Sequence, residues 1–514
     1  MSEISSNNKR IAKNTMMLYI RMLLSTVVSL YTSRVVLQTL GVEDYGIYGV
    51  VGGVVAMFSF LNSTMSGATS RFLTFEMGKG DKERLKATFS SALIIHIGIA
   101  LLVLVLAETV GIWFLNNKLV IPEGRMEAAH WVLQFSVLGM IVGFTQVPYN
   151  AAIIAHEKMD VYAYVELIHV FLKLGIVYLL WIGNFDKLIL YAFLTLAVNV
   201  IVAMIYRIYC IRHYEESKFK WVWKKEIFRP MLSFSGLNLF VNISSMIHTQ
   251  SIVFFINIFF GAIVNAACNI ASTINGMLKG LGYNITAASG PHIIKCYALN
   301  KLEEMQNTMN NCLKFSTLFM VMIAIPFYFE TPFIIQLWLG QIPNYAVPFI
   351  RISLIISCLS MINSVIKIGI DATGNIKSHS FCTIISSLIA MLSTYCFFKF
   401  GYDAQYAYIV DLSTFTLVLI ANIFILKRQI KGINISKILF EILRIIFITS
   451  ISTMLVTIPY VCLQPSVYRV IIIIIVSTLS IGLLAYTFVL NKNQRKYVNI
   501  LISEKLLRKI IIRR

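Results

Sequence analysis

Charged residues are scarce in this sequence, and acidic residues are scarcer than basic ones. Only 13% of the 514 residues are Asp, Glu, Lys or Arg, whereas a soluble domain carries about 25%. Hydrophobic residues make up 58% of the chain, and the mean hydropathy is +0.76. These values exclude an ordinary soluble domain and predict an all-α polytopic membrane protein.

Patterns typical of disulfides, metal sites and catalysis are also missing. The eight cysteines stand singly, without CxxC spacing, so we expect free thiols, no disulfide and no metal. We find no catalytic motif and expect no cofactor. The net charge of +20 comes without a basic patch interleaved with aromatics, and we therefore expect no nucleic-acid partner. Such a charge is typical of a membrane protein that keeps Lys and Arg on its cytoplasmic side.

The N-terminal region is polar and leads into a hydrophobic stretch of full membrane length, which predicts a retained anchor. Fourteen stretches approach the roughly 20 apolar residues that a spanning helix needs. With the N-terminus in the cytoplasm, 32 Lys and Arg fall in cytoplasmic segments and 5 in outer loops, so both termini are predicted inside. The predicted spans are 15–37, 45–65, 88–115, 129–151, 161–182, 188–210, 231–255, 261–285, 315–335, 347–370, 381–400, 406–426, 442–462 and 470–490.

The sequence contains an internal repeat. LGVEDYGIYGVV, which begins at Leu40, resembles FGAIVNAACNIA, which begins at Phe260. The loop GKGDKERLK corresponds to YALNKLEEM at almost the same offset, and AHEK after the fourth span corresponds to ATGN after the tenth. Six spans separate each element from its copy, so the copies keep their orientation and are predicted to form two pseudo-symmetric six-helix lobes.

The repeat and the loop charges divide the chain. We predict an N-terminal lobe at 1–210, a basic interfacial linker at 211–230 and a C-terminal lobe at 231–427. Two further helices lie at 428–490, and a basic cytoplasmic tail follows at 491–514. The linker and the tail mix basic and apolar residues, which favours contact with membrane lipids at an anionic surface; plain loops are the alternative.

Four basic residues lie inside the predicted spans: Arg21, Arg34, Lys173 and Lys279. A cation at mid-bilayer costs about 2.5–3.5 kcal/mol on insertion scales, so these residues predict a site for something negative that crosses the membrane. Arg21 and Arg34 lie roughly 220° apart around an ideal helix, and both face one cavity only if that helix bends. Snorkelling to the interface is the alternative for each.

Polar residues repeat on single faces of the seventh and eighth spans. These faces carry Asn238, Asn242, Ser245 and Thr249, and then Asn265, Asn269 and Ser272. Such faces are too polar for lipid, and Asn and Ser supply the neutral donors and acceptors that a sugar needs. We therefore predict a cavity lining, with polar contacts between helices as the alternative.

Three ionisable residues share one face of the fifth span: Glu166, His169 and Lys173. They predict either a proton relay or a charge-compensating cluster without a transport role. Asp411 in the twelfth span predicts part of a cation site, and the alternative is a helix-end acid or the partner of a nearby cation. A coupling ion, H⁺ or Na⁺, stays open at this point.

Several strings resemble the bacterial oligosaccharide flippases of the Wzx type, in the superfamily that also holds MATE drug exporters and the lipid II flippase. They are TSRVVLQTLGVEDYGIYGVVGGVV at 32–55, RFLTFEMGKGD at 71–81 and AHEKM at 155–159. The resemblance implies two six-helix lobes in a V, two extra helices, and a cationic cavity lined by the first, second, seventh and eighth helices. Arg21, Arg34 and Lys279 lie on that set, and Lys173 does not.

The resemblance also implies a function. Such a protein moves undecaprenyl-diphosphate-linked oligosaccharide from the inner to the outer leaflet of the bacterial inner membrane, for O-antigen, capsule or exopolysaccharide assembly. We expect a monomeric transporter rather than an enzyme, with a polysaccharide polymerase and a chain-length regulator as partners. A cation-coupled drug exporter and a membrane polymerase or glycosyltransferase are the alternatives. The arginines and missing carboxylates of the first span, and the short loops, disfavour them.

Overall fold

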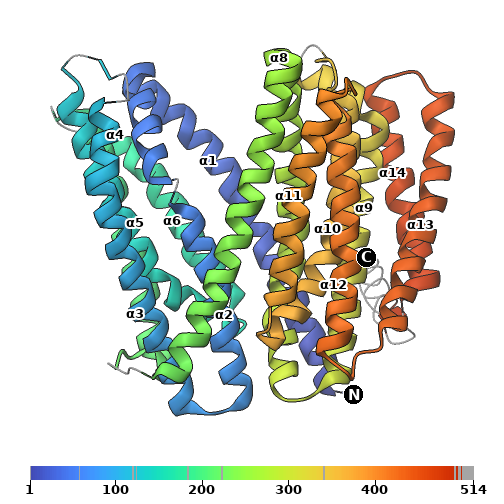
Figure 1. Ribbon diagram of the computed structural model, residues 1–514, viewed down its shortest axis with the longest axis horizontal. Coiled ribbons are helices and arrows are strands. Elements are labelled where there is room, and N and C mark those ends of the chain that lie inside the picture. Colours follow the sequence, from blue (N-terminus) through green and yellow to red (C-terminus); the bar gives the residue numbers. More distant parts are fainter. Residues whose placement is uncertain are drawn as a thin grey trace, which may run out of the picture. The chain divides into compact units, whose positions relative to one another are not determined.

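The computed structural model describes residues 2–56, 58–117, 121–122, 124–181, 185–220, 224–339, 342–490, 494–495 and 499. Helices account for nearly all of these residues, and the described part of the chain holds no strand. Figure 1 shows the long helices that make up the structure. The predicted all-α membrane fold is therefore confirmed.

Each predicted span lies on helical segments, because apolar runs of this length satisfy their backbone hydrogen bonds only as helices. Spans 1 and 2 run along α1 into α2, and spans 7 and 8 lie within α8. The helices are α1 Ser2–Ala56, α2 Ser59–Lys79, α3 Lys82–Leu106, α4 Ile112–Asn117, α5 Met126–Ala155, α6 Met159–Leu179, α7 Lys187–His213, α8 Lys225–Ala298, α9 Leu302–Leu339, α10 Ala346–Thr373, α11 Lys377–Lys399, α12 Tyr406–Gln429, α13 Ile435–Cys462 and α14 Val467–Leu484, with short helical turns at Ala107–Gly111, Glu215–Ser217 and Ala485–Val489.

Among the described residues, 11 helices are long and apolar enough to cross a membrane. The remaining predicted spans lie in α1, in the start of α2 and in the second part of α8, each of which includes residues outside the described part of the chain. The helices are consistent with fourteen spans, and the count of fourteen stays a prediction.

Two glycines break the longest helices at matching places. Gly41 in α1 has φ 82° and ψ 168°, and Gly261 in α8 has φ 81° and ψ −178°. This backbone region is essentially restricted to glycine. The two glycines occupy equivalent positions in the strings at Leu40 and Phe260, so the repeat seen in the sequence recurs in the backbone.

Apart from Gly401, the other described residues with positive φ follow the same repeat. Gly80 and Asn300 have φ 76° and 60°, and each ends a helix just before the next one begins. Further pairs, about 220 residues apart, are Gly124 with Tyr345 and Glu157 with Gly374. A left-handed residue other than glycine is uncommon, and its return at equivalent turns supports duplicated architecture.

The described chain forms two compact units, each composed of several segments. Unit 1 comprises 1–245, 287–305 and 368–381. Within it, α5 packs most closely against α7, α2 and α3, and α1 packs along α6. A core of buried side chains that includes Phe89, Tyr149 and Tyr206 joins these helices.

Unit 2 comprises 246–286, 306–367 and 382–514. A core of buried side chains in this unit includes Ile256, Met320, Phe349 and Tyr408, with the Phe349 and Tyr408 rings stacked at 4.4 Å. The helices α13 and α14 pack against each other, as Figure 1 shows in orange-red. The predicted lobes are continuous stretches of the chain, whereas each unit combines several segments. The predicted lobe boundaries therefore stay a prediction.

Candidate functional site

A charged cluster lies between α1, α6 and α7 of unit 1. The guanidinium carbon of Arg21 lies 5.0 Å from the ring centre of Tyr162, a cation–π distance. Glu166 accepts a hydrogen bond of 3.2 Å from the Tyr206 hydroxyl, and its other oxygen lies 3.9 Å from His169 Nδ1. The predicted cavity cation Arg21 thus lies in the same cluster as the predicted ionisable face of α6.

Lys173 extends this cluster by one helical turn. It lies within electrostatic range of Glu166, and its side chain is exposed. Arg34 also lies on α1, but its side chain falls outside the described residues. The helix has no break between residues 21 and 34, since Gly41 is its one non-helical position.

A second cluster of the same composition lies in unit 2. His248 Nε2 of α8 lies 4.0 Å from Asp411 Oδ1 of α12, and Lys279 is within electrostatic range of the same carboxylate. All three side chains are half-buried. The structure therefore places a cation next to Asp411, one of the arrangements considered for it. Each of the two clusters holds one carboxylate, one histidine and at least one basic side chain.

The polar face of the seventh span lies on the first part of α8. Asn238 is half-buried and donates a hydrogen bond of 3.2 Å to the Phe234 carbonyl. Asn242 and Thr249 are exposed, Ser245 is half-buried, and Ser272 further along α8 is exposed. The side chains of Asn265 and Asn269 lie outside the described residues. Exposed amides and hydroxyls on a membrane helix favour a water-filled or polar space over lipid.

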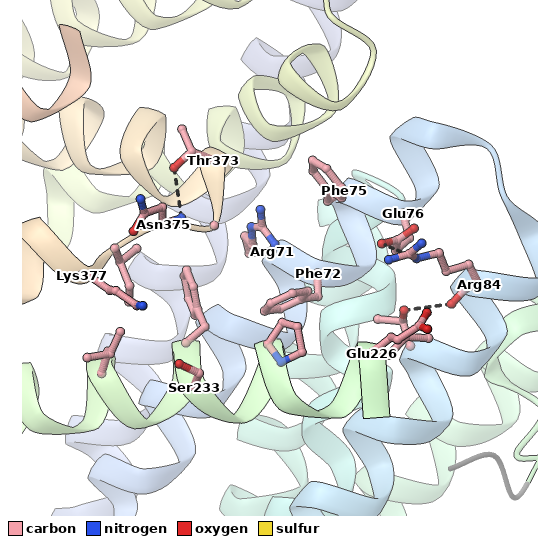
Figure 2. Close-up of a pocket in the computed structure, with 17 residues that line it drawn as sticks. Arg71, Phe72, Phe75, Glu76, Arg84, Glu226, Ser233, Thr373, Asn375 and Lys377 are labelled. Atoms are coloured by element: carbon pink, nitrogen blue, oxygen red, sulfur yellow. Dashed lines mark hydrogen bonds and ion pairs between the residues drawn. The ribbon is translucent and has the colours of Figure 1, made fainter. Parts of the chain in front are cut away.

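A basic pocket of about 570 Å³ lies in unit 1, where α2, α3, the start of α8 and the turn from α10 to α11 meet (Figure 2). Arg71 is its buried centre and donates hydrogen bonds of 2.9 Å to the carbonyls of Asp371 and Ala372. Its guanidinium carbon lies 4.6 and 4.8 Å from the rings of Phe72 and Phe75. Burial lowers the pKa of Arg71 to about 10, so the side chain remains a cation at neutral pH.

Two ion pairs of unit 1 involve Arg84 and Asp44, which lie in the repeated strings. Arg84 Nε lies 3.2 Å from the buried carboxylate of Glu76, next to Arg71 in the pocket. At the other end of the helices, Arg125 bridges Asp44 and Asp186, with 2.9 Å from its Nε to Asp44 Oδ1. The hydrogen bond that Arg125 donates to the Asp186 carboxylate is the largest cause that raises the pKa of Arg125.

A family model described as "Polysaccharide biosynthesis protein" matches residues 9–296. The chain belongs to this family. A family relative, "Uncharacterized membrane protein EpsK" of Bacillus subtilis (strain 168), is 20% identical over 325 residues, which are 62% of this chain and 63% of the relative. The match therefore spans less than two thirds of that protein.

Solved structures show which fold this family member has. The crystal structure of MATE in the bent conformation has a TM-score of 0.70 at 13% identity, and the match covers 87% of this chain and 97% of that one. A MOP superfamily transporter from Pyrococcus furiosus has a TM-score of 0.66 at 14% identity, with 85% and 96% covered. The family member thus has a MATE-like fold, and its described helices are long and apolar enough for a multi-pass membrane protein.

Sequence reasoning misses the partners of several charged residues. Arg125 and Arg469 count as outer-loop residues in the sequence, yet Arg469 is buried against Glu330 with hydrogen bonds of 2.6 and 2.9 Å. It also misses the pocket around Arg71, although this arginine begins the string RFLTFEMGKGD. The one available signal is an arginine whose neighbours, Phe72 and Phe75, are aromatic.

Proposed function

We propose that this transporter moves undecaprenyl-diphosphate-linked oligosaccharide from the inner to the outer leaflet of a bacterial inner membrane by alternating access. The family description supports a role in polysaccharide biosynthesis. The observation that carries the proposal is the presence of basic side chains on membrane helices in both units, Arg21 and Lys173 in one and Lys279 in the other. A diphosphate is the part of such a cargo that needs them.

The chemistry of the two charged clusters fits an anionic headgroup. Arg21 retains guanidinium N–H groups that the Tyr162 ring does not use, because a cation–π contact engages the face of the cation rather than its donors. Lys173 is exposed, and an exposed ammonium at membrane depth is costly in hydrocarbon. We therefore place these cations on an aqueous cavity wall.

The polar face of α8 fits the neutral part of the cargo. Asn242 and Thr249 are exposed on this helix, and their amide and hydroxyl groups bond sugar hydroxyls as donors or as acceptors. Asn238, Ser245, Asn265, Asn269 and Ser272 would extend this lining. Glu166, His169 and Asp411 would neutralise the cations when no cargo is bound, and they are the groups through which H⁺ or Na⁺ coupling would act.

The proposal is tested by alanine variants in a strain that depends on this protein for its surface polysaccharide. Arg21→Ala and Lys279→Ala are expected to abolish surface polysaccharide at normal protein level, with lipid-linked oligosaccharide accumulating on the inner leaflet. Arg351→Ala is the matched control, since Arg351 packs over the Tyr328 ring at 5.1 Å and bonds its carbonyl at 3.0 Å. Normal export in both test variants would remove these cations from the mechanism.

The same strain separates this function from drug export. A drug exporter of MATE type would change susceptibility to cationic compounds when deleted, and its loss would leave the polysaccharide intact. We expect the reverse: unchanged susceptibility and lost polysaccharide.

We further propose that the transporter is a monomer in the inner membrane with both termini cytoplasmic. It would supply a polysaccharide polymerase whose product length a separate regulator sets.

A further inference from the structure

A cluster of three side chains lies at the turn between α8 and α9, away from the membrane clusters and the basic pocket. It comprises His292 and Cys296 near the end of α8 and Glu304 in the first turn of α9. His292 and Cys296 are buried, with 5% and 2% exposed, and Glu304 is half-buried. The spacing of four residues places the imidazole and the thiol on one face of α8.

The three donor atoms of this cluster lie close to one another. His292 Nε2 lies 3.4 Å from Glu304 Oε1 and 3.6 Å from Cys296 Sγ, and the three donor atoms all lie within 4.8 Å of one another. In a tetrahedral zinc site with ordinary bond lengths, the edges are about 3.4 Å between nitrogen and oxygen and about 3.6 Å between nitrogen and sulfur. Two of the three edges therefore already have the length that a bound zinc ion requires.

A fourth residue, the carboxylate Glu157, lies near the other ring nitrogen of His292 but beyond hydrogen-bond distance. Glu157 Oε1 lies 4.0 Å from His292 Nδ1, the ring nitrogen on the far side from the thiol. Glu157 is buried and has φ 57°, in the turn that follows α5. Histidines that bind metal through one nitrogen commonly donate the other N–H to a carboxylate, which fixes the ring and raises its basicity.

We propose that His292 Nε2, Cys296 Sγ and Glu304 Oε1 bind a Zn²⁺ ion, with Glu157 holding the imidazole and a water molecule completing the tetrahedron. An imidazole, a thiolate and a carboxylate together are the donor set that zinc accepts, whereas Mg²⁺ and Ca²⁺ require oxygen donors alone. On binding, the thiol loses its proton to solvent and the sulfur forms the bond to zinc. No electron is transferred.

The first half of the chain contains an equivalent turn with which this site can be compared. Counting back 220 residues from Cys296 and Glu304 gives Glu76 and Arg84, which flank the equivalent turn and form an ion pair of 3.2 Å. The ion pair ties α2 to α3 across that turn. A carboxylate and a thiol cannot form such an ion pair, but a zinc ion bound by both would join the same two positions. His292 would supply the third ligand.

The site is expected to restrain the segments that it joins. The ion would tie the end of α8 to the start of α9, and His292 would tie both to the α5–α6 turn through Glu157. The backbone carbonyl of Glu157 also accepts a hydrogen bond of 2.9 Å from Asn14 on α1. Binding at three residues would thus stiffen the junction of α1, α8, α9 and the α5–α6 turn in unit 1.

Metal binding is tested directly on purified full-length protein in detergent, isolated with a tag free of histidine. Co²⁺ is added as the spectroscopic probe, because a cobalt–thiolate bond gives a near-ultraviolet charge-transfer band. Zn²⁺ is then titrated to displace it, which reports the zinc affinity. We expect one equivalent of Co²⁺ per chain, and loss of the band in Cys296→Ser.

Matched variants separate this site from adventitious binding. Glu304→Gln is expected to weaken zinc binding strongly and Glu157→Gln by about 10–100-fold. Glu303→Gln, one residue away and exposed, and Cys396→Ser, an exposed thiol elsewhere, are expected to match the wild type. Size-exclusion profiles check that each variant is folded.

Three results would overturn the proposal: a wild-type protein without the thiolate band, a band that persists in Cys296→Ser, or equal losses in Glu304→Gln and Glu303→Gln. None of these measurements depends on transport, so the outcome is independent of the cargo proposed above.

Discussion

Gly374 illustrates how a single residue controls the basic pocket. Its φ is 77°, and a Cβ built there would lie 2.6 Å from Arg71 Nη2. Any side chain at this position would push the guanidinium away from the carbonyls of Asp371 and Ala372 in the last turn of α10, of which the Asp371 carbonyl also accepts a hydrogen bond of 3.0 Å from the Gly374 N–H. The glycine is therefore required by both the backbone and the arginine.

Gly374→Ala is expected to destabilise the protein more than Gly401→Ala. Both residues have positive φ, which costs alanine about 1–2 kcal/mol, but a Cβ at Gly401 meets nothing within 4 Å. The additional loss of stability at Gly374 then reports the effect of displacing the Arg71 guanidinium. Thermal unfolding midpoints of the two variants in detergent check this, and equal midpoints would contradict the assigned role of Arg71.

The ion pair of Arg469 with Glu330 acts at the scale of helices. It joins the start of α14 to α9 inside unit 2, with Glu330 fully buried and Arg469 8% exposed. Arg469 also lies 4.8 Å from the Tyr460 ring near the end of α13. One side chain thus contacts three helices, which explains how α13 and α14, outside the repeat, are attached to it.

Glu330→Gln is expected to destabilise the protein by about 3–5 kcal/mol, because it leaves a buried guanidinium without its carboxylate. Adding Arg469→Met should recover much of that loss, since the uncompensated charge is then removed. Glu215→Gln serves as the control: its pair with Lys86 is 3.9 Å long and exposed, and such pairs contribute little. Chemical unfolding of the variants provides the measurement, and a Glu330→Gln loss as small as the control would refute the argument.

At the scale of the whole molecule, the topology rests on the charge distribution of the loops. The segment after α12 carries Lys427, Arg428 and Lys431, and the positive-inside rule places it in the cytoplasm only if the number of spans is even up to that point. A fusion after Lys427 with a reporter that is active only in the cytoplasm is expected to be active. A periplasmic reading would break the count of fourteen and the parallel repeat with it.

The fold is largely predictable from the sequence because membrane helices obey a length and hydropathy rule that acts locally. The repeat is predictable too, and the paired glycines Gly41 and Gly261 give it a backbone basis. Partners across helices are not predictable: one sequence carries no distances, so Arg125 and Arg469 look like loop residues. The expectation of no metal rests on the absence of CxxC spacing. That criterion does not detect a His-x₃-Cys pair that a residue on the next helix completes.

Arg71 donates hydrogen bonds to the last turn of α10. If the two halves of the repeat were identical, the second half would contain an equivalent arginine that makes the same contact, but this chain has none. The residue 220 positions after Arg71 is Pro291, which carries neither a cation nor a backbone N–H. A dimer of identical halves would make this contact twice, once in each direction, and the fused polypeptide makes it once. The two halves are therefore not interchangeable at this point: two copies of the second half alone would have a proline where the arginine is required.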